Sequence, residues 1–479
     1  MAHLLRDRGF EAYAVVGGIG ALDERVAAVA DGSRSEAGTR QVGALAALRH
    51  RAFRRFAAGA LLSLTGNWIE AASFGYVVLL LGGSPATLGI IGFLNTIPNL
   101  IWGLPAGVLA DRYDRRKLLL GFQGANMAVA VLLAVLWQTD SLTVPLMGAI
   151  AVVGGSLGTL SFPAFQGMLA STVDREDLES AVAINSLFLQ LARFIGPAIA
   201  GVLLAQGGPT WVFAANAASF VGVLVAVAML PGSKATARDA MTAIGGSMRE
   251  AVNYVFSQRS LATLMALTAL AGVFGTPPVA FMIPAIAREE LHGGAGTLGA
   301  LTAAIGFGSL LGSVLLVLVA KRPNKGEPVI VGFLVSAVAV AGVGASNSVG
   351  LSVVLAVAGG IGGVVFVGLS TVVMQSVASD DMRARVTAIW AAAFVGLLPF
   401  GGLITAGLAA WLGPGGAVTV DALIMLGGGI VVMLRRPEIA WLGCAALPEA
   451  CVAGADPVAV ATQRAREAPP PIAEPVSTA

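Results

Sequence analysis

Two charged side chains, Glu70 and Arg193, stand inside long apolar stretches of this 479-residue chain. A charge buried in a bilayer costs about 2.5–3.5 kcal/mol on insertion scales, so such residues are expected to serve a function. Counted at the helical rise from Ala57 and Ala181, they lie about 20 Å and about 18 Å into their stretches. We therefore predict that they lie at similar depth and can form an ion pair.

A Glu70–Arg193 ion pair would have one of two roles. If it forms in one conformation and breaks in another, it switches the proton affinity of the glutamate, which is what proton coupling requires. If it persists, it only fastens two helices. Asn67 and Ser73 share helical spacing with Glu70 and predict one polar face around it. The three histidines lie outside these stretches, so carboxylates are the proton carriers that the sequence offers.

A second group of charges lies in residues 111–117, which carry two aspartates, three arginines and one lysine. The stretches 85–110 and 118–137 on either side carry no charge. Two apolar helices joined by a short basic connector predict two membrane crossings whose connector stays in the cytoplasm. Gly107, just before this connector, would let its helix approach a neighbour closely.

The composition predicts an integral membrane protein, with 56% apolar and only 12% charged residues. Of the 29 lysines and arginines, 27 fall in segments on one side of the expected membrane, which predicts an even number of crossings with both termini in the cytoplasm. These residues then signal orientation, so nucleic acid is not expected as a partner. A crossing needs about 20 helical residues, and we predict twelve: 53–81, 85–110, 117–137, 143–171, 181–205, 209–230, 260–287, 296–320, 328–346, 349–377, 384–411 and 415–434.

The crossings divide into two related halves. Gly208-Pro209 recurs as Gly413-Pro414, and Asn216 and Asp421 each stand eight residues past the glycine, which favours an internal repeat. Asp421 is expected at the membrane interface, outside the site. We expect a mobile cytoplasmic extension (1–52), an N-terminal six-helix half (53–230), a cytoplasmic linker with an amphipathic surface helix (231–259), a C-terminal six-helix half (260–434) and a disordered cytoplasmic tail (435–479).

The residues from Gly107 to Lys117, Gly-Val-Leu-Ala-Asp-Arg-Tyr-Asp-Arg-Arg-Lys, resemble the signature between helices two and three of the major facilitator superfamily. Their Asp-Arg-x-Asp-Arg-Arg form is similar to that of the bacterial exporter branch that includes the enterobactin exporter and drug:proton antiporters. The segment 196–201, with Gly196, Pro197 and Gly201, resembles the antiporter motif of helix five, although Ala200 replaces one of its glycines.

The resemblance implies an all-α membrane protein with twelve helices in two six-helix halves. It also implies that Asp111 meets the N-terminus of helix eleven, near Arg383–Val386, where a carboxylate satisfies free amides and the helix dipole. Asp111 would then be a conformational latch, together with Gly107, Arg112, Arg115 and Arg116. The alternative, a cluster that only sets topology, suits Arg115, Arg116 and Lys117.

The resemblance further places helix one along a central cavity. Polar and aromatic residues on the expected cavity-facing helices are the candidate substrate contacts: Trp68, Asn95, Asn99, Trp102, Gln166, Gln190 and Trp390. Asn95, Asn99 and Trp102 are spaced four and three apart, hence on one helix face. Apolar and aromatic walls with few polar groups suit a hydrophobic or amphipathic solute.

The sequence thus predicts a proton-coupled exporter, an antiporter of a drug, siderophore or metabolite, in the bacterial inner membrane. Its expected partners are a small organic substrate, protons and the lipid bilayer; its oligomeric state is not predicted. No catalytic constellation, cofactor motif or metal cluster is present, so an enzyme is not expected. Two alternatives stay open: an uptake or facilitated-diffusion carrier, and a non-transporting membrane scaffold or sensor.

Overall fold

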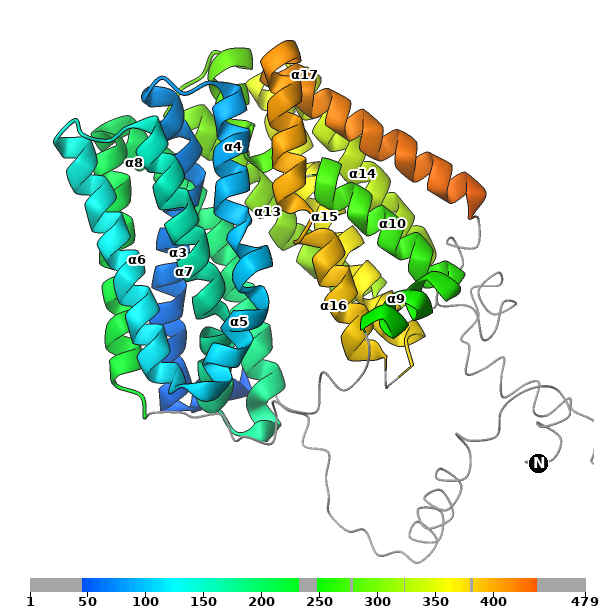
Figure 1. Ribbon diagram of the computed structural model, residues 1–479, viewed down its shortest axis with the longest axis horizontal. Coiled ribbons are helices and arrows are strands. Elements are labelled where there is room, and N and C mark those ends of the chain that lie inside the picture. Colours follow the sequence, from blue (N-terminus) through cyan, green and yellow to red (C-terminus); the bar gives the residue numbers. More distant parts are fainter. Residues whose placement is uncertain (1–44, 232–247, 276–278, 323, 380–381, 437–479) are drawn as a thin grey trace, which may run out of the picture.

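The computed structural model describes residues 45–231, 248–275, 279–322, 324–379 and 382–436, and within these ranges the chain is helical without a strand (Figure 1). The expectations for most of the N-terminal extension, for the first part of the linker and for the tail lie outside the described residues.

The first half runs from a short 3-10 turn to a long kinked helix. Its elements are η2 (Ala46–Arg49), α3 (Arg51–Leu80), α4 (Pro85–Thr96), α5 (Pro98–Arg112), α6 (Arg115–Gln138), α7 (Val144–Ser171), η3 (Arg175–Asp177) and α8 (Leu178–Ala228). The second half contains α9 (Met248–Ser257), α10 (Arg259–Phe274), α12 (Ile283–Ala285), the π-helix η4 (Ile286–Glu290), α13 (Ala295–Val319), α14 (Gly326–Ala345), α15 (Val349–Val377), α16 (Arg383–Phe394) and α17 (Leu398–Arg435).

Two of these helices turn back at a glycine. Gly208 in α8 has φ 71° and ψ −170°, and Gly413 in α17 has φ 73° and ψ 173°. Glycine tolerates this left-handed φ, and the proline that follows each glycine cannot donate a helical hydrogen bond. Each helix therefore supplies two crossings. Counted in this way, the described residues are consistent with the expected twelve crossings in two groups of six.

Three of the predicted crossings are interrupted along their length. The stretch 85–110 is divided at Ile97, because Pro98 begins α5 and has no N–H for α4 to use. The stretch 384–411 is divided at residues 395–397, with Pro399 in the first turn of α17. In 260–287, α10 ends at Phe274 and a π-helix follows from Ile286.

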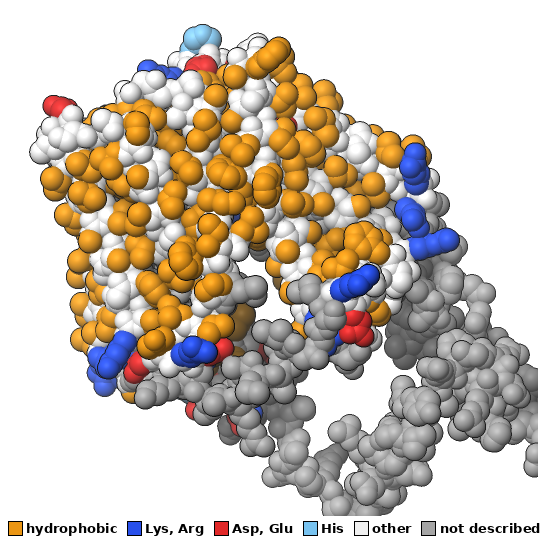
Figure 2. Space-filling view, viewed as in Figure 1, with side chains coloured by type: hydrophobic (Ala, Val, Ile, Leu, Met, Phe, Trp, Pro, Cys, Tyr) orange, Lys and Arg blue, Asp and Glu red, His pale blue; other side chains and the backbone are white. Residues whose placement is uncertain are grey.

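The two halves touch at one end of the molecule and separate at the other. We call the end with residues 111–117 the basic end and the other the closed end. At the closed end α4 lies beside α17, whereas α5 and α16 stand apart at the basic end (Figure 1). A Cβ built on Gly89 of α4 would lie 2.4 Å from the Ala406 Cβ of α17, so the helices meet backbone to backbone. The side chains leave a gap between the halves toward the basic end (Figure 2).

The linker helix α9 is a helix as predicted, but it packs on the second half against α10 and α16. Its Ala251 and Val255 side chains are fully buried, and Glu250 forms a 3.5 Å ion pair with Arg385 of α16. These contacts attach α9 to one half. Its role as a spacer between the halves stays a prediction.

Asp421, which was expected to reach the membrane interface, is fully buried within the protein. Its Oδ2 accepts a hydrogen bond of 2.5 Å from Thr405 Oγ1, and Oδ1 has no partner among the described residues. The sequence placed Asp421 near a helix end. However, the turn at Gly413 folds the two arms of α17 together, so Thr405 before the turn meets Asp421 after it.

Replacing Thr405 with valine is expected to lower the free energy of unfolding by about 1–3 kcal/mol, because the carboxyl of Asp421 then loses its hydroxyl partner while it stays buried. Thermal unfolding of the purified protein in detergent measures the change. Thr405→Ser keeps the hydroxyl and is the matched control. Equal melting temperatures for the valine and serine variants would contradict this role.

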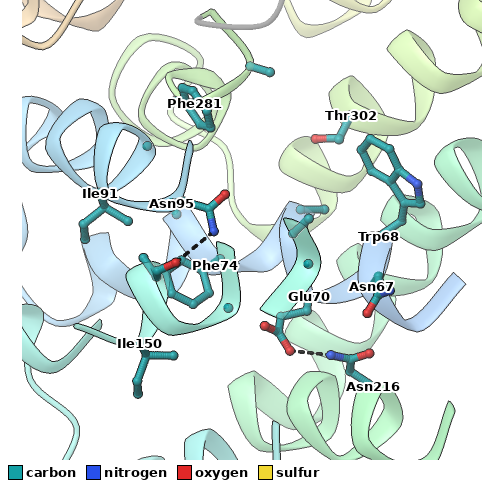
Figure 3. A pocket seen from close by; sticks show the side chains of 18 of the residues that line it. Asn67, Trp68, Glu70, Phe74, Ile91, Asn95, Ile150, Asn216, Phe281 and Thr302 are labelled. Atoms are coloured by element: carbon teal, nitrogen blue, oxygen red, sulfur yellow. Dashed lines mark hydrogen bonds between the residues drawn. The ribbon is translucent and has the colours of Figure 1, made fainter. Parts of the chain in front are cut away.

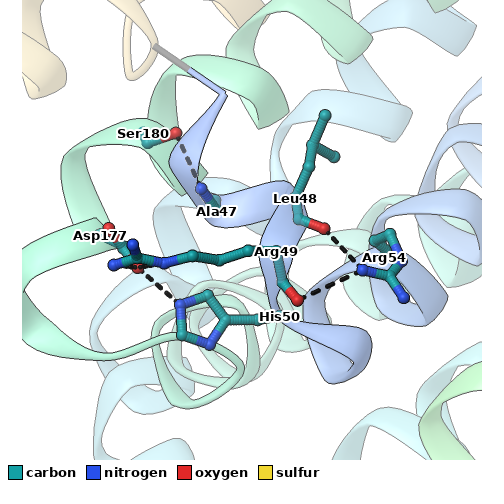
Figure 4. A network of polar contacts seen from close by, with 7 residues as sticks. All are labelled: Ala47, Leu48, Arg49, His50, Arg54, Asp177 and Ser180. Atoms are coloured by element: carbon teal, nitrogen blue, oxygen red, sulfur yellow. Dashed lines mark hydrogen bonds and ion pairs between the residues drawn. The ribbon is translucent and has the colours of Figure 1, made fainter. Parts of the chain in front are cut away.

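A polar network fastens the start of α3 to the turn before α8 (Figure 4). The Asp177 carboxylate, 1% exposed, accepts hydrogen bonds from His50 Nε2 at 2.6 Å and Arg49 Nε at 2.9 Å. The Ala47 N–H donates to Ser180 Oγ. The hydrogen bond from His50, aided by Arg49, holds the pKa of Asp177 below its usual value of 3.8.

Asp177→Asn is expected to lower the melting temperature at neutral pH. Because the pKa of Asp177 is lowered by folding, its stabilising contribution is present above the unfolded pKa near 3.8 and is lost as pH falls through the lower folded pKa. The difference from wild type should therefore shrink below pH 4, as measured by thermal unfolding across a pH series. Exposed Glu176→Gln is the control, and a pH-independent difference would argue against the network.

Candidate functional site

A cavity of about 520 Å³ lies between the two halves (Figure 3). The first half contributes residues of α3, α4, α6, α7 and α8, and the second half contributes α12, α13, α17 and the segment before α12. Its wall is mainly apolar, with Phe74, Ile91, Phe281 and Leu298 on it. The polar and charged side chains that line it are Asn67, Glu70, Asn95, Gln123, Asn126, Ser161, Arg193, Asn216 and Thr302.

Glu70 lines this cavity from the middle of α3, as the sequence predicts. Its carboxylate accepts a hydrogen bond from the Asn216 side-chain amide (Figure 3). Asn216 lies on the second arm of α8 and is only 3% exposed. The predicted polar face is divided, because Asn67 lines the cavity whereas Ser73 is fully buried and donates to the Ile69 carbonyl.

Arg193 lines the same cavity but does not pair with Glu70 among the described ion pairs. Its guanidinium carbon lies 5.4 Å from the ring centroid of Trp68, a cation–π arrangement. Trp68 and Glu70 are two residues apart on α3, so they project about 200° apart around the helix axis. Depth in the membrane was therefore a poor guide to pairing: Arg193 reaches the face of α3 that carries Trp68, and Asn216 reaches the face that carries Glu70.

The break at Ile97 changes the prediction for helix two. Asn95 lines the cavity and donates to the Ala151 carbonyl at 3.4 Å. Asn99 instead accepts a 2.7 Å hydrogen bond from Thr159 of α7, and Trp102 is 39% exposed; neither is among the residues that line the cavity. Their spacing predicted one face of an unbroken helix, and a new helix begins between them.

Three further cavity candidates also lie elsewhere. Gln190 of α8 donates to Ser309 O at 3.2 Å and to Ser313 Oγ at 2.8 Å on α13, so it joins the halves. Trp390 stacks on Phe394 within α16, with ring centroids 5.8 Å apart. Gln166 is exposed on α7. Of the predicted substrate contacts, the cavity thus brings together Trp68 and Asn95.

The charged connector is fastened to its own half. Arg116 donates to the Val227 and Ala228 carbonyls at the end of α8, and Arg115 covers Gly167 of α7. Asp111 is 41% exposed and faces Arg115 at 4.0 Å. Arg112 is exposed as well.

Among the described residues Asp111 pairs with Arg115 and not with residues 383–386, and α5 and α16 stand apart at the basic end (Figure 1). For the same reason, a Cβ on Gly107 would meet open space rather than a neighbouring helix. Arg385, at the expected docking position, pairs with Glu250 instead. In this conformation the residues that were predicted to form a latch therefore do not bridge the two halves in the described contacts.

The antiporter-like segment lies on the seam between the halves. Gly196 packs on Trp68 of α3, where an added Cβ would lie 2.6 Å from the Trp68 Cβ. Gly201 and Gly299 of α13 face each other, so a Cβ on Gly201 would lie 2.9 Å from the Gly299 Cα. Pro197 is buried beside them. The small residues therefore allow α8 and α13 to touch along their backbones.

Sequence reasoning missed several cavity residues. Asn216 was noted only because it matches Asp421 in the internal repeat. A polar residue at the same position of both halves, within an apolar stretch, was a signal that the position faces the protein interior. Phe281 packs on Gly92 from a segment that was expected to be an ordinary helix. Gln123 and Asn126 are three apart in an otherwise apolar stretch, a spacing that would have revealed a polar face.

The model of the transmembrane secretion effector family matches residues 42–447. The chain is 25% identical to the enterobactin exporter EntS of Citrobacter koseri over 394 residues, which is 81% of this chain and 93% of that protein. It is 23% identical to the multidrug efflux pump Tap of Mycolicibacterium fortuitum, over 81% of this chain and 96% of the pump. The chain is 30% identical to the staphyloferrin A transporter of Staphylococcus aureus over 172 residues, which is 36% of this chain and 43% of that protein.

Solved structures resemble the fold at low sequence identity. A bacterial homologue of the human lysosomal transporter Spinster, in an inward-facing and unoccupied conformation, matches with a TM-score of 0.62 at 14% identity, over 82% of this chain and 96% of that one. The nucleoside transporter NupG matches with a TM-score of 0.64 at 11% identity, over 81% of this chain and 99% of that one.

The fold shared with these solved transporters, the matching family and the exporter relatives together define a multi-pass membrane transporter of the major facilitator superfamily, which carries small molecules and is not an enzyme. Within that class, the chain belongs to the transmembrane secretion effector family.

Proposed function

We propose that this protein is a proton-coupled exporter, an antiporter that moves a hydrophobic or amphipathic organic solute by alternating access. The observation that carries the proposal is the carboxyl group of Glu70 on the wall of a cavity between two halves that touch at one end and separate at the other. The names of the relatives, an enterobactin exporter and a multidrug efflux pump, support export. A drug, siderophore or metabolite fits the apolar and aromatic wall.

The basic end is proposed to face the cytoplasm, because basic connectors stay on that side. Both termini then lie in the cytoplasm of a bacterium whose inner membrane holds the protein. In this orientation the described conformation is the inward-facing one, with the cavity accessible to solute from the cell. Closure of the basic end would bring Asp111 to α16 and complete one half of the transport cycle.

Glu70 is proposed to carry the proton. A proton that arrives from outside neutralises the carboxyl, and its release to the cytoplasm leaves a carboxylate that Asn216 can hold by its amide donor. Arg193 is the other charged side chain among the cavity residues, so the deprotonated glutamate faces a positive charge across the same space. Rocking of the halves about the Gly196–Gly201 segment would couple proton uptake to the outward-facing state and proton release to the inward-facing state.

The test is flux through the full chain reconstituted in sealed vesicles with an amphipathic fluorescent dye. An imposed pH gradient should drive the dye against its concentration gradient, and a protonophore should remove that drive. Flux that is indifferent to the gradient would favour a facilitated-diffusion carrier. No flux beyond that of empty vesicles would favour a scaffold or sensor, and either result overturns the proposal.

A further inference from the structure

Two of the side chains that line the cavity are charged, and their surroundings differ. The carboxylate of Glu70 is held by Asn216 (Figure 3). The guanidinium of Arg193 forms no ion pair or hydrogen bond with the residues that the structure describes, and it lies over the ring of Trp68. The cavity therefore contains a positive charge that its described walls leave without a carboxylate.

The contact with Trp68 holds Arg193 without using its hydrogen bonds. A cation over an indole is attracted by the π face of the ring, whereas the five N–H groups of a guanidinium need acceptor oxygens. Packing fixes this arrangement, because Gly196 presses on the Trp68 Cβ from the helix that carries Arg193. The ring thus positions the guanidinium and leaves its N–H donors for a ligand in the cavity.

We propose that Arg193 and Trp68 form a subsite for a carboxylate group of the transported solute, so that the substrate is an amphipathic organic acid in its ionised form. The inference rests on the proposed transport function and adds the class of substrate. A guanidinium binds a carboxylate through two parallel hydrogen bonds, a geometry that an ammonium cannot match.

The rest of the cavity suits the body of such a molecule. Phe74, Ile91 and Phe281 provide apolar surface from α3, α4 and the segment before α12. Asn67 and Asn95 add neutral amides that can bind hydroxyl or carbonyl groups. Glu70, the other charged side chain among these lining residues, already has Asn216 as a partner, and the remaining lining residues are neutral. Arg193, unpartnered among the described residues, therefore favours a solute with a single anionic end.

The subsite also lies beside the contact between the two halves. The Arg193 carbonyl faces Gly306 of α13, where an added Cβ would lie 2.3 Å from the oxygen, and the Phe194 and Phe307 rings pack 5.4 Å apart beside it. The backbone that carries Arg193 therefore packs on the second half, while its guanidinium lies over Trp68 of the first half.

Binding of three related probes to the purified full chain in detergent tests this subsite. The probes are naphthalene-2-carboxylate, its neutral amide and 2-(aminomethyl)naphthalene, which share an apolar body and differ in charge. At pH 7.5 the carboxylate is expected to bind about 10- to 100-fold more tightly than the amide, the range for a hydrogen bond to a charged group. The amine should bind more weakly than the amide.

Arg193→Gln should abolish the preference for the carboxylate, and Arg193→Lys should keep part of it, because the charge remains without the two-pronged geometry. Arg259→Gln removes an exposed arginine at the start of α10 and is the control for loss of charge. Equal binding of the carboxylate and the amide to wild type, or a preference that survives Arg193→Gln, would overturn the proposal.

The binding measurement needs no gradient, so its failure is distinguishable from a failure of proton coupling. If wild type binds the carboxylate and the amide equally but still shows gradient-driven flux, the subsite alone is overturned.

Discussion

Replacing Glu70 with glutamine is expected to reduce proton-gradient-driven efflux to the level of empty vesicles, while exchange of solute without a gradient continues. Glutamine has nearly the same shape, and its amide oxygen can still accept the hydrogen bond from Asn216. The variant therefore keeps the packing of α3 against α8 and loses only the group that can take up and release a proton. A structural role for Glu70 would leave coupling intact.

The measurement compares dye flux in vesicles with and without a pH gradient for wild type, Glu70→Gln and Glu179→Gln. Glu179 is an exposed acid in the first turn of α8, outside the cavity, and serves as the matched control for loss of a carboxylate. Membrane insertion is checked by the yield and melting temperature of each variant. Undiminished coupled efflux in Glu70→Gln would remove this residue from the mechanism.

Asp111→Asn and Gly89→Val are expected to shift the balance between the two access states in opposite directions. Asp111 is proposed to bind the N-terminus of α16 when the basic end closes, and such a charge–dipole contact contributes about 0.3–2 kcal/mol. Its loss should favour the described conformation by about two- to thirtyfold. A valine at position 89 would press on Ala406 and on the Gly402 carbonyl of α17, each 2.4 Å from the added Cβ, and should force the closed end open.

A single reporter cysteine can follow this balance from both sides of the membrane. Ser161 lines the cavity, and replacing it with cysteine in a chain without Cys444 and Cys451 leaves one thiol for impermeant reagents. Asp111→Asn should increase labelling from the cytoplasmic side, and Gly89→Val should increase labelling from outside. Gly121→Val is the control, because a Cβ there meets nothing within 4 Å. Unchanged labelling in Asp111→Asn would contradict the latch.

Much of the architecture could be predicted from the linear sequence. Apolar length and the side on which basic residues fall depend on residues that are adjacent in sequence, so the crossings and the basic connector were predictable within a few residues. The two Gly-Pro pairs marked both sharp turns, because a left-handed φ favours glycine wherever it occurs. The exporter-like signature at residues 107–117 indicated the family.

The composition of the cavity was less predictable because it depends on how far each helix is rotated about its axis. Depth along a helix follows from counting residues, and Glu70 and Arg193 do line one cavity. Which side of α3 each partner reaches is a property of helix packing, so the expected ion pair is not formed in this conformation and Asn216 was missed. The break before Pro98 likewise turned Asn99 toward Thr159 and left Trp102 outside the cavity.

The sequence by itself determined that the chain crosses a membrane many times, where its connectors lie, and that an acid and a base stand among apolar residues. Hydropathy and charge are added up over neighbouring residues of the sequence. In lipid, a helix must also form its own backbone hydrogen bonds, whatever helices lie beside it. Only the tertiary structure decided that Arg193 faces Trp68, that Asp421 is buried beside Thr405, and that the halves meet at Gly89 while Asp111 pairs within its own half. These contacts join residues far apart in sequence, and their formation depends on close packing between whole helices and on which end of the molecule is closed.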